Sequence, residues 1–261
     1  MTMQFVQFER VAEGVGLITL SRPEAANAMS VQLLTELSAT LDQINRDPAV
    51  RVVLLTGAGE KAFCAGADLK ERQGMSDRQV KEIVQLIGAI VAKVEALAQP
   101  VIAVLNGVAF GGGLELALAC DLRIAATHAK VGLTETSLGI IPGAGGTQRL
   151  PRLIGMDKAK ELIYTARRLD AEQAKCYGIV SYVYEKHELR KRALQLAGEI
   201  AKNAPLALMQ AKLAINQGVE VDLITGLKIE SLAYSALIPT KDRLEGLRAF
   251  QEKRAPHYSG N

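Results

Sequence analysis

Two glutamates in this sequence stand next to glycine-rich segments. Glu115 follows the three consecutive glycines at 111–113 within an otherwise apolar stretch, and Glu135 precedes the segment Gly139–Gly146. Paired buried carboxylates position water and move protons, because burial and mutual repulsion raise the pKa of at least one of them. These two residues are therefore candidates for acid–base chemistry. The alternative for each is a structural carboxylate that is paired within the fold.

The glycines predict a site at which backbone N–H groups bind an oxygen atom. A helix that begins in the triple glycine presents N–H groups at the positive end of its dipole, and residues without a Cβ let a ligand approach them closely. Gly66 and Ala67, within the segment Ala62–Arg72, are candidates for a second donor. Two converging N–H groups form an oxyanion hole for an enolate or a tetrahedral oxyanion. The alternative is that the glycines only allow a helix to pack tightly against a strand.

Other kinds of catalytic site find no support in the sequence. The glycine-rich segments match neither a phosphate-binding loop that ends in Gly-Lys-Ser/Thr nor a G-x-G-x-x-G turn, and no G-x-S-x-G elbow is present. The histidines, His128, His187 and His257, lack the spacing of metal ligands, so no metal site is expected. Cys64 has no histidine near it in the sequence and is interpreted as a small core residue.

The composition excludes several classes of protein. The chain has 261 residues, of which 49% are hydrophobic and 4% aromatic, and its 31 basic and 28 acidic residues leave a net charge of +3. These values exclude a disordered chain and argue against nucleic acid or a membrane surface as the main partner. Three cysteines argue against a disulfide scaffold and suit a reducing compartment. Since 1–13 carries no apolar signal region, we expect a cytoplasmic protein.

The elements that must position these groups alternate between strands and helices over the first 190 residues. Phe5–Arg10 and Val15–Leu20 predict a hairpin, and Ser30 is expected to cap a helix that ends near Arg46. The patterns further predict strands at 52–56, 101–105 and 122–126, helices at 77–98 and 114–119, and a loop at 57–68. After Arg190 only helices are expected, at 189–202, 205–216, 221–237 and 240–253. The sequence therefore predicts an α/β core over residues 1–190 that contains the site, and a helical region over residues 191–261.

Four segments, in this order, resemble the enoyl-CoA hydratase/isomerase (crotonase) family: Leu20–Ala28, Ala62–Asp68, Gly107–Asp121 and Gly139–Pro151. The resemblance covers nearly the whole chain. It implies a spiral of β-β-α units, a C-terminal helical trimerisation region, and a homo-oligomer, usually a hexamer built as a dimer of trimers. A finer similarity to methylglutaconyl-CoA hydratases, the branch that includes the AU-rich-RNA-binding enoyl-CoA hydratases, is carried by Ala65–Arg72, Ala211–Gly218 and Ile238–Gly246.

The resemblance also implies roles for the residues of the site. By position, the backbone N–H groups of Ala67 and Gly112 bind the thioester oxygen. Glu115 and Glu135 match the two catalytic glutamates of the hydratases, of which many isomerase and other branches lack one. The implied reaction is syn addition of water across a 2-enoyl thioester, with Glu115 as the base for water and Glu135 as the proton donor to the α-carbon. No metal or redox cofactor is implied, because coenzyme A arrives as part of the acyl-CoA substrate.

Residues that contact the coenzyme A portion follow from the same resemblance. Pantetheine and adenine are expected along Arg22–Ala26 and Ala65–Leu69, and a neighbouring subunit is expected to close over the nucleotide. The implied substrate-binding residues are Arg22, Ala25, Ala26, Ala65, Asp68, Leu69, Gly111 and, from the neighbour, Phe250 and Lys253. The small residues at 25 and 26 depart from the family, in which many members carry a lysine or arginine and a larger residue there.

The choice of acyl chain is open to several hypotheses. A methylglutaconyl substrate, which belongs to leucine degradation, carries a second carboxylate and calls for a cation in the acyl pocket, for which Arg72, Arg78 and Lys81 are candidates. A general short-chain enoyl-CoA hydratase of fatty-acid β-oxidation would have a neutral pocket instead. Double-bond isomerisation is a further enzymatic alternative. An RNA-binding protein that keeps a hydratase fold is the alternative from another class, and the nearly balanced charge argues against it.

Overall fold

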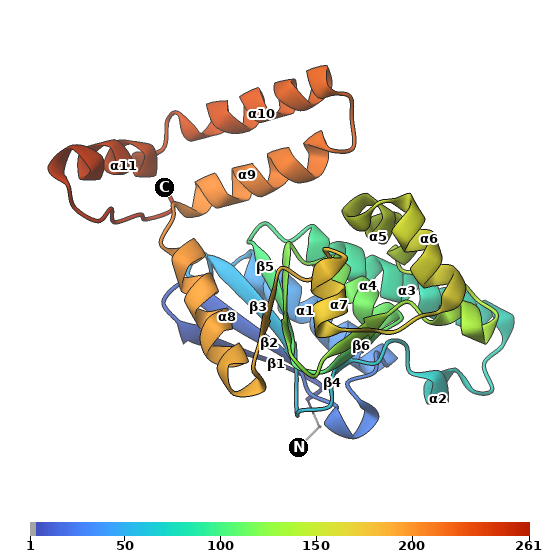
Figure 1. Cartoon of the computed structure of the whole chain (residues 1–261). Coiled ribbons are helices and arrows are strands. Elements are labelled where there is room, and N and C mark those ends of the chain that lie inside the picture. Colours follow the sequence, from blue (N-terminus) through green and yellow to red (C-terminus); the bar gives the residue numbers. More distant parts are fainter. Residues whose placement is uncertain (1–3) are drawn as a thin grey trace.

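A six-stranded sheet forms the centre of the computed structural model, which describes residues 4–261 (Figure 1). The first two strands form an antiparallel hairpin, and every further neighbour in the sheet is parallel. In spatial order the strands are β1 (Val6–Ala12), β2 (Val15–Leu20), β3 (Val52–Gly57), β5 (Val101–Leu105), β7 (Leu122–Ala126) and β10 (Tyr182–Tyr184). The hairpin and the strands predicted at 52–56, 101–105 and 122–126 are confirmed.

Helices cover both faces of this sheet, which explains why its central strands are continuous apolar runs. On one face, α1 (Val31–Asn45) and α3 (Asp77–Glu95) pack on strand residues such as Val53 and Leu55. On the other face, α8 (Lys186–Ala201) packs on the alternate residues, such as Leu54. Ser30 caps α1 as predicted, since its side chain accepts a hydrogen bond from the N–H of Leu33.

A second sheet of short strands was not predicted from the sequence, and its first strand lies within the loop predicted at 57–68. Its order is β4 (Ala62–Cys64), β6 (Val108–Phe110), β8 (Lys130–Gly132) and β9 (Leu169–Asp170), and only β8 and β9 are antiparallel. Strands of two or three residues carry no readable alternation and are stabilised by partners distant in sequence. This sheet brings the segment after β4 beside the helix that follows β6.

That helix, α4 (Gly112–Leu118), lies inside the molecule. Every residue from Gly113 to Leu118 is buried, as expected for a helix that is apolar on all sides except for one glutamate. The remaining short elements are η1 (Pro23–Ala25), α2 (Leu69–Arg72), η2 (Glu135–Leu138), α5 (Gly146–Ile154), α6 (Met156–Thr165) and α7 (Ala171–Cys176). Within residues 4–261, none of the helices is both long and apolar enough to cross a membrane.

The C-terminal helices project from this body as an arm (Figure 1). We use the name C-terminal arm for α9 (Pro205–Gly218), α10 (Leu223–Leu237) and α11 (Lys241–Glu252). The predicted α/β class with C-terminal helices is confirmed. The division predicted near residue 190 falls within α8, whose buried residues Leu189, Ala193 and Ala197 pack on the sheet, so the two-region division stays a prediction.

Candidate active site

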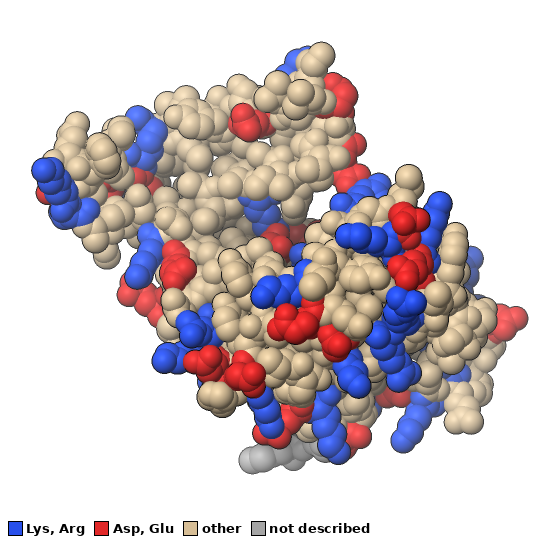
Figure 2. Space-filling model, in the orientation of Figure 1, with Lys and Arg blue, Asp and Glu red and all other residues tan. Residues whose placement is uncertain are grey.

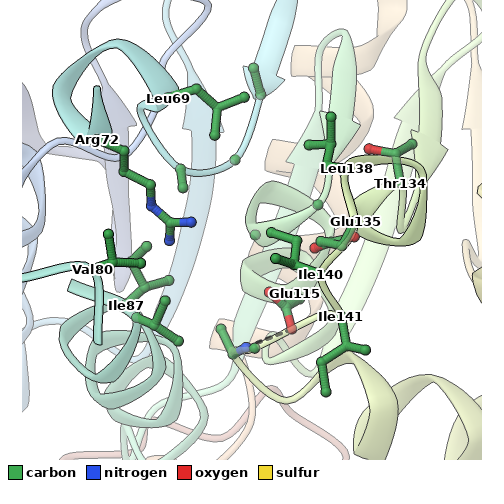
Figure 3. A pocket seen from close by; sticks show the side chains of 18 residues that line it. Leu69, Arg72, Val80, Ile87, Glu115, Thr134, Glu135, Leu138, Ile140 and Ile141 are labelled. Carbon is green, nitrogen blue, oxygen red and sulfur yellow. Dashed lines mark hydrogen bonds between the residues drawn. The ribbon is translucent and has the colours of Figure 1, made fainter. Parts of the chain in front are cut away.

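A cavity of about 670 Å³ lies between the second sheet, α3 and the segment that precedes α5. Its walls come from stretches that are far apart in the sequence but close in space (Figure 3). The lining residues are Ala65, Gly66, Ala67, Leu69, Arg72, Val80, Val84, Ile87, Gly111, Gly112, Glu115, Thr134, Glu135, Leu138, Ile140, Ile141, Gly143 and Ala144. The fold therefore brings both glutamates and the predicted oxyanion donors to one space.

Glu115 is held by the backbone of the segment before α5. It is only 3% exposed, and its Oε1 accepts hydrogen bonds from the N–H groups of Ala144 and Gly146, each at 2.7 Å. Figure 3 draws one of these bonds to Glu115 as a dashed line. Burial raises the pKa of Glu115, whereas these two N–H groups and the Arg149 guanidinium lower it. One carboxylate oxygen is thus fixed, and the other is left for a ligand in the cavity.

Glu135 has the opposite surroundings. It begins η2 and is 8% exposed, and its Oε2 is buried without a hydrogen-bond partner among the residues described. Burial, with a smaller contribution from the charge of Glu115, raises the pKa of Glu135 to about 7. A Cβ on Gly111, where φ is +52°, would lie 3.1 Å from Oε1 of Glu135, so the glycine gives this carboxylate its room.

The N–H groups of Ala67 and Gly112 meet the requirements of an oxyanion hole. In the described part of the chain neither N–H has an acceptor, and that of Gly112 is the first of α4, at the positive end of the helix. The two segments touch, since a Cβ on Gly66 would lie 2.8 Å from the carbonyl oxygen of Phe110 and 3.2 Å from the nitrogen of Gly112. The two N–H groups therefore border the same small volume.

Tight packing explains one glycine of the triplet, and access to the backbone explains the others. A Cβ on Gly113 would collide with the carbonyl of Cys64 in β4, so this residue lets the helix and the strand meet. Gly111 and Gly112, in contrast, line the cavity. The two interpretations of the triple glycine thus apply to different residues.

The part of the cavity across from Glu115 and Glu135 is lined by apolar side chains and by Arg72. Val80, Val84 and Ile87 follow one another at helical spacing on α3 and face this part. Arg72 lies on the same side of the cavity as these α3 residues, across from Glu115 and Glu135 (Figure 3), and its Nε is buried without a partner among residues 4–261. Of the three cations predicted for this part, Arg72 alone lines the cavity, because Arg78 is exposed and pairs with Glu82, and Lys81 is exposed.

The residues predicted along coenzyme A divide into two groups. Ala65, Leu69 and Gly111 line the cavity. Arg22, Ala25, Ala26 and Asp68 lie beside it, and the N–H of Ala65 donates to the carbonyl of Ala26 at 3.0 Å, so the two predicted segments are adjacent. Arg22 forms an ion pair of 3.0 Å with Asp68, and both side chains are largely buried. The charge of Arg22 is therefore already offset within the fold.

Phe250 and Lys253 lie outside the cavity of their own chain. Phe250 is 86% exposed near the end of α11, and Lys253 follows that helix. Figure 1 shows α11 at the end of the C-terminal arm farthest from α2, which forms part of the cavity wall. Their predicted contact with the nucleotide requires a neighbouring subunit and stays a prediction.

Several contributors to the site were not predicted from the sequence. They are the N–H groups of Ala144 and Gly146, the guanidinium of Arg149, and the apolar wall from α3 and Leu138–Ile141. The glycine segment before α5 was a visible signal, and so was the spacing of Val80, Val84 and Ile87. Neither pattern indicates which residues, distant in the sequence, these N–H groups and apolar side chains contact.

Other reactive groups do not form a second site in the part of the chain described. No group of histidine, cysteine, aspartate and glutamate residues there is arranged to hold a metal ion. Cys64 is fully buried, and burial raises the pKa of its thiol to about 12, so it is not a nucleophile at neutral pH.

Known proteins share both the sequence and the fold. The model of the enoyl-CoA hydratase/isomerase family matches residues 10–261. The protein YngF of Bacillus subtilis (strain 168) is 58% identical over 248 residues, which cover 95% of this chain and 95% of that protein. The mitochondrial methylglutaconyl-CoA hydratase of Homo sapiens is 50% identical over 256 residues, which cover 97% of this chain and 76% of that protein.

A solved structure agrees over the full length. The crystal structure of an enoyl-CoA hydratase from Bacillus anthracis matches with a TM-score of 0.98 and 56% identity, covering 99% of this chain and 100% of that chain. This chain therefore belongs to the enoyl-CoA hydratase/isomerase (crotonase) family. The predicted family, the crotonase-like fold and the enzyme class, an enoyl-CoA hydratase, are confirmed. The roles of individual residues and the identity of the acyl chain stay predictions.

Proposed function

We propose that this protein adds water in syn fashion across the double bond of a 2-enoyl-CoA thioester. The observation that carries the proposal is the meeting, in one cavity, of two buried carboxylates and two backbone N–H groups that have no acceptor among the described residues. An enolate-forming hydration needs these groups and no redox step. Coenzyme A enters as part of the substrate, so no separate cofactor is part of the proposal.

In the proposed mechanism the thioester oxygen accepts hydrogen bonds from the N–H groups of Ala67 and Gly112. Glu115 removes a proton from water as the water oxygen bonds to the β-carbon, and the enolate charge develops between the two N–H groups. Protonated Glu135 then gives its proton to the α-carbon. Loss of one oxyanion donor typically costs about 3 kcal/mol of transition-state stabilisation. A pKa near 7 lets Glu135 carry this proton at neutral pH.

The test is the hydration of a panel of 2-enoyl-CoA thioesters by the wild-type protein, Glu115→Gln and Glu135→Gln. Each variant keeps the shape of the side chain and removes its acid–base function, so each is expected to lose about 100-fold to 10,000-fold in kcat. Thr136→Val, next to Glu135 but outside the cavity lining, serves as the control. Wild-type rates in both glutamate variants would refute the mechanism.

For the acyl chain we propose methylglutaconyl-CoA or a similar short branched acyl-CoA, which would assign the protein to leucine degradation. Two observations support this choice. The human enzyme of that name is 50% identical. At the apolar end of the cavity, Nε of Arg72 is a donor without a partner in the described part of the chain. A guanidinium there suits the second carboxylate of such a substrate.

Paired substrates separate this proposal from its nearest alternative. Arg72→Met is expected to lower kcat/KM for methylglutaconyl-CoA at least about tenfold more than for crotonyl-CoA, because only the former carries a distal carboxylate. Arg78→Met, which alters an exposed ion pair, is the matched control. An equal loss on both substrates would contradict a role of Arg72 in carboxylate binding.

A general short-chain enoyl-CoA hydratase is the second candidate, because Val80, Val84 and Ile87 form an apolar wall that fits a neutral acyl chain. Wild-type preference for crotonyl-CoA would favour it. Isomerisation would instead convert 3-enoyl-CoA without incorporating oxygen from solvent. For RNA binding, Figure 2 offers no support, since basic and acidic side chains are interspersed over the visible face of the body.

We further propose that the C-terminal arm assembles the protein into a homo-oligomer, a hexamer built as a dimer of trimers. Large apolar side chains are exposed along it, and Figure 2 shows few charged side chains over α9 and α10. The most exposed on α9, α10 and the turn between them are Ile215, Val219, Leu223, Ile224, Leu232 and Tyr234. Sedimentation equilibrium tests this: Leu232→Glu is expected to reduce the assembly, and a monomeric wild-type protein would contradict it.

A further inference from the structure

Arg149 on α5 contacts two parts of the fold at once. Its Nε donates to Oε1 of Glu95 at 2.9 Å and its Nη2 to Oε2 at 2.6 Å, which is the two-pronged geometry of a strong arginine–carboxylate pair. Its Nη1 donates to the carbonyl oxygen of Ala144 at 2.9 Å. The guanidinium therefore joins the end of α3 to the segment that precedes α5.

The carbonyl that Arg149 contacts belongs to the segment that holds Glu115. The N–H groups of Ala144 and Gly146 both donate to Oε1 of Glu115. The carbonyl of Ala144 lies in the peptide unit between those that carry the two N–H groups. Because each peptide unit is planar, anchoring the middle one restricts the orientation of its neighbours on both sides.

The backbone at Gly145 leaves the space that the Arg149 guanidinium occupies. Gly145 has φ +101°, and a Cβ at this position would collide with Nη1 of Arg149. A larger residue would therefore be strained and would displace the guanidinium. At the start of α5, the N–H groups of Gln148 and Arg149 donate to the carbonyl of Gly145 at 3.0 and 2.8 Å, which anchors the next peptide unit as well.

Glu95 fixes the direction of the guanidinium. It is the last residue of α3, where a carboxylate interacts unfavourably with the negative end of the helix dipole. The guanidinium of Arg149, whose side chain is 18% exposed, offsets this interaction. The ion pair with Arg149, and not the helix dipole, therefore accounts for a glutamate at the end of α3.

Arg149 also acts on Glu115 through its charge. The guanidinium lowers the pKa of Glu115 and opposes the larger effect of burial. The other charged groups around Glu115 are Glu135 from η2, which repels it, and Arg72 from α2 on the opposite wall. From α3, Glu95 partly neutralises Arg149. Loss of the Arg149 charge therefore favours the protonated form of Glu115.

We propose that Arg149 is a positioning residue for Glu115: oriented by Glu95, it holds the Ala144–Gly146 segment and thereby keeps the carboxylate in place and ionised. The residue touches neither the cavity nor a substrate, and it acts through the backbone and its charge. The consequence for turnover rests on the proposed hydratase function. The effect of Arg149 on the position and ionisation of Glu115 does not depend on that function.

The test compares three variants of the full-length protein. Arg149→Met removes the charge and the hydrogen bonds, and Arg149→Lys keeps the charge without the two-pronged geometry. Arg152→Met is the matched control, since Arg152 lies on the same helix and pairs with Glu220 at a distance from the cavity. Arg149→Met is expected to lower kcat by about 10-fold to 100-fold with KM nearly unchanged. Arg149→Lys should lose less, and Arg152→Met should match the wild type.

The pH profile separates positioning from general damage to the fold. Glu115 accepts a proton only when ionised, so kcat/KM falls on the acid side of its profile. This acid limb should move to higher pH in Arg149→Met and stay in place in Arg149→Lys. A ¹³C NMR titration of the Glu115 carboxyl measures the same shift without turnover.

Defined results would overturn the proposal. They are a wild-type kcat and acid limb in folded Arg149→Met, or a loss confined to KM. If Arg149→Met does not fold, the kcat values of Arg149→Lys and Glu95→Gln test the proposal instead. A wild-type kcat in both of these variants would overturn the proposal. If the wild-type protein hydrates no 2-enoyl-CoA, the proposed function fails, and the NMR titration still decides whether Arg149 acts on Glu115.

Discussion

Glu115 and Glu135 share one cavity but meet opposite surroundings. Two backbone N–H groups fix one oxygen of Glu115, and a guanidinium lies behind them. For Glu135, burial outweighs the backbone groups that lower its pKa, and its Oε2 has no partner among the residues described. Both are buried, and the pKa of Glu135 rises to about 7. In the proposed mechanism, these different surroundings separate two side chains of the same type into a base and an acid.

The largest expected effect concerns which of the two glutamates exchanges a proton with the α-carbon of the substrate. Exchange of the α-hydrogens of a saturated acyl-CoA with D₂O requires a base at that carbon but no attacking water. Glu135→Gln is expected to slow this exchange by about 100-fold or more, and Glu115→Gln by much less. NMR measurement of deuterium incorporation into butyryl-CoA checks this, and equal losses would remove the division of roles.

The oxyanion donors should matter to both carboxylates. A Cβ on Gly66 would lie 2.8 Å from the carbonyl oxygen of Phe110, so Gly66→Ala is expected to displace the N–H of Ala67. We expect a loss of about 100-fold to 1,000-fold in kcat, as for removal of one oxyanion donor. Gly74→Ala is the control, because Gly74 also has positive φ but has nothing near its Cβ position. Equal steady-state rates of the two variants would contradict this assignment.

The pH dependence should show the two environments as two limbs. Glu135 must be protonated to act as the acid, so kcat/KM is expected to fall about tenfold per pH unit above its pKa of about 7. The residual activity of Glu135→Gln should lack this basic limb and keep the acid limb of Glu115. Rate measurements from pH 5 to 9 test this, and a basic limb that persists in Glu135→Gln would assign it to another group.

The smallest expected effect concerns the free energy of unfolding. The folded-state pKa of Glu135 lies above its ordinary value of 4.5, so ionisation is disfavoured in the fold and stability is lost as pH rises through 7. At pH 8, Glu135→Gln is therefore expected to stabilise the protein by up to about 3 kcal/mol. Glu115→Gln should gain less, since two N–H groups and Arg149 already offset part of the burial cost. Urea unfolding measures both, and an equal or larger gain in Glu115→Gln would contradict the comparison.

Much of the molecule was predictable because its signals are local. The hairpin, the Ser30 cap and the long helices follow from periodicity over neighbouring residues. The glycine motifs and the two glutamates indicated the site before any geometry was known. The short strands β4, β6, β8 and β9 were not predicted, because pairing between distant segments stabilises them and their own residues carry too little pattern.

The sequence by itself indicated acid–base chemistry beside an oxyanion hole. Residue types and their order along the chain are enough to place two glutamates next to glycines whose N–H groups a ligand can reach. Tertiary structure alone decided how these groups differ. Of three candidate cations it placed only Arg72 in the lining of the cavity, and it placed the N–H groups of Ala144 and Gly146 on Glu115. It also left Oε2 of Glu135 without a partner among residues 4–261. The physical reason is that a pKa and an orientation depend on burial and on partners within a few ångströms, and folding brings those partners from distant parts of the chain.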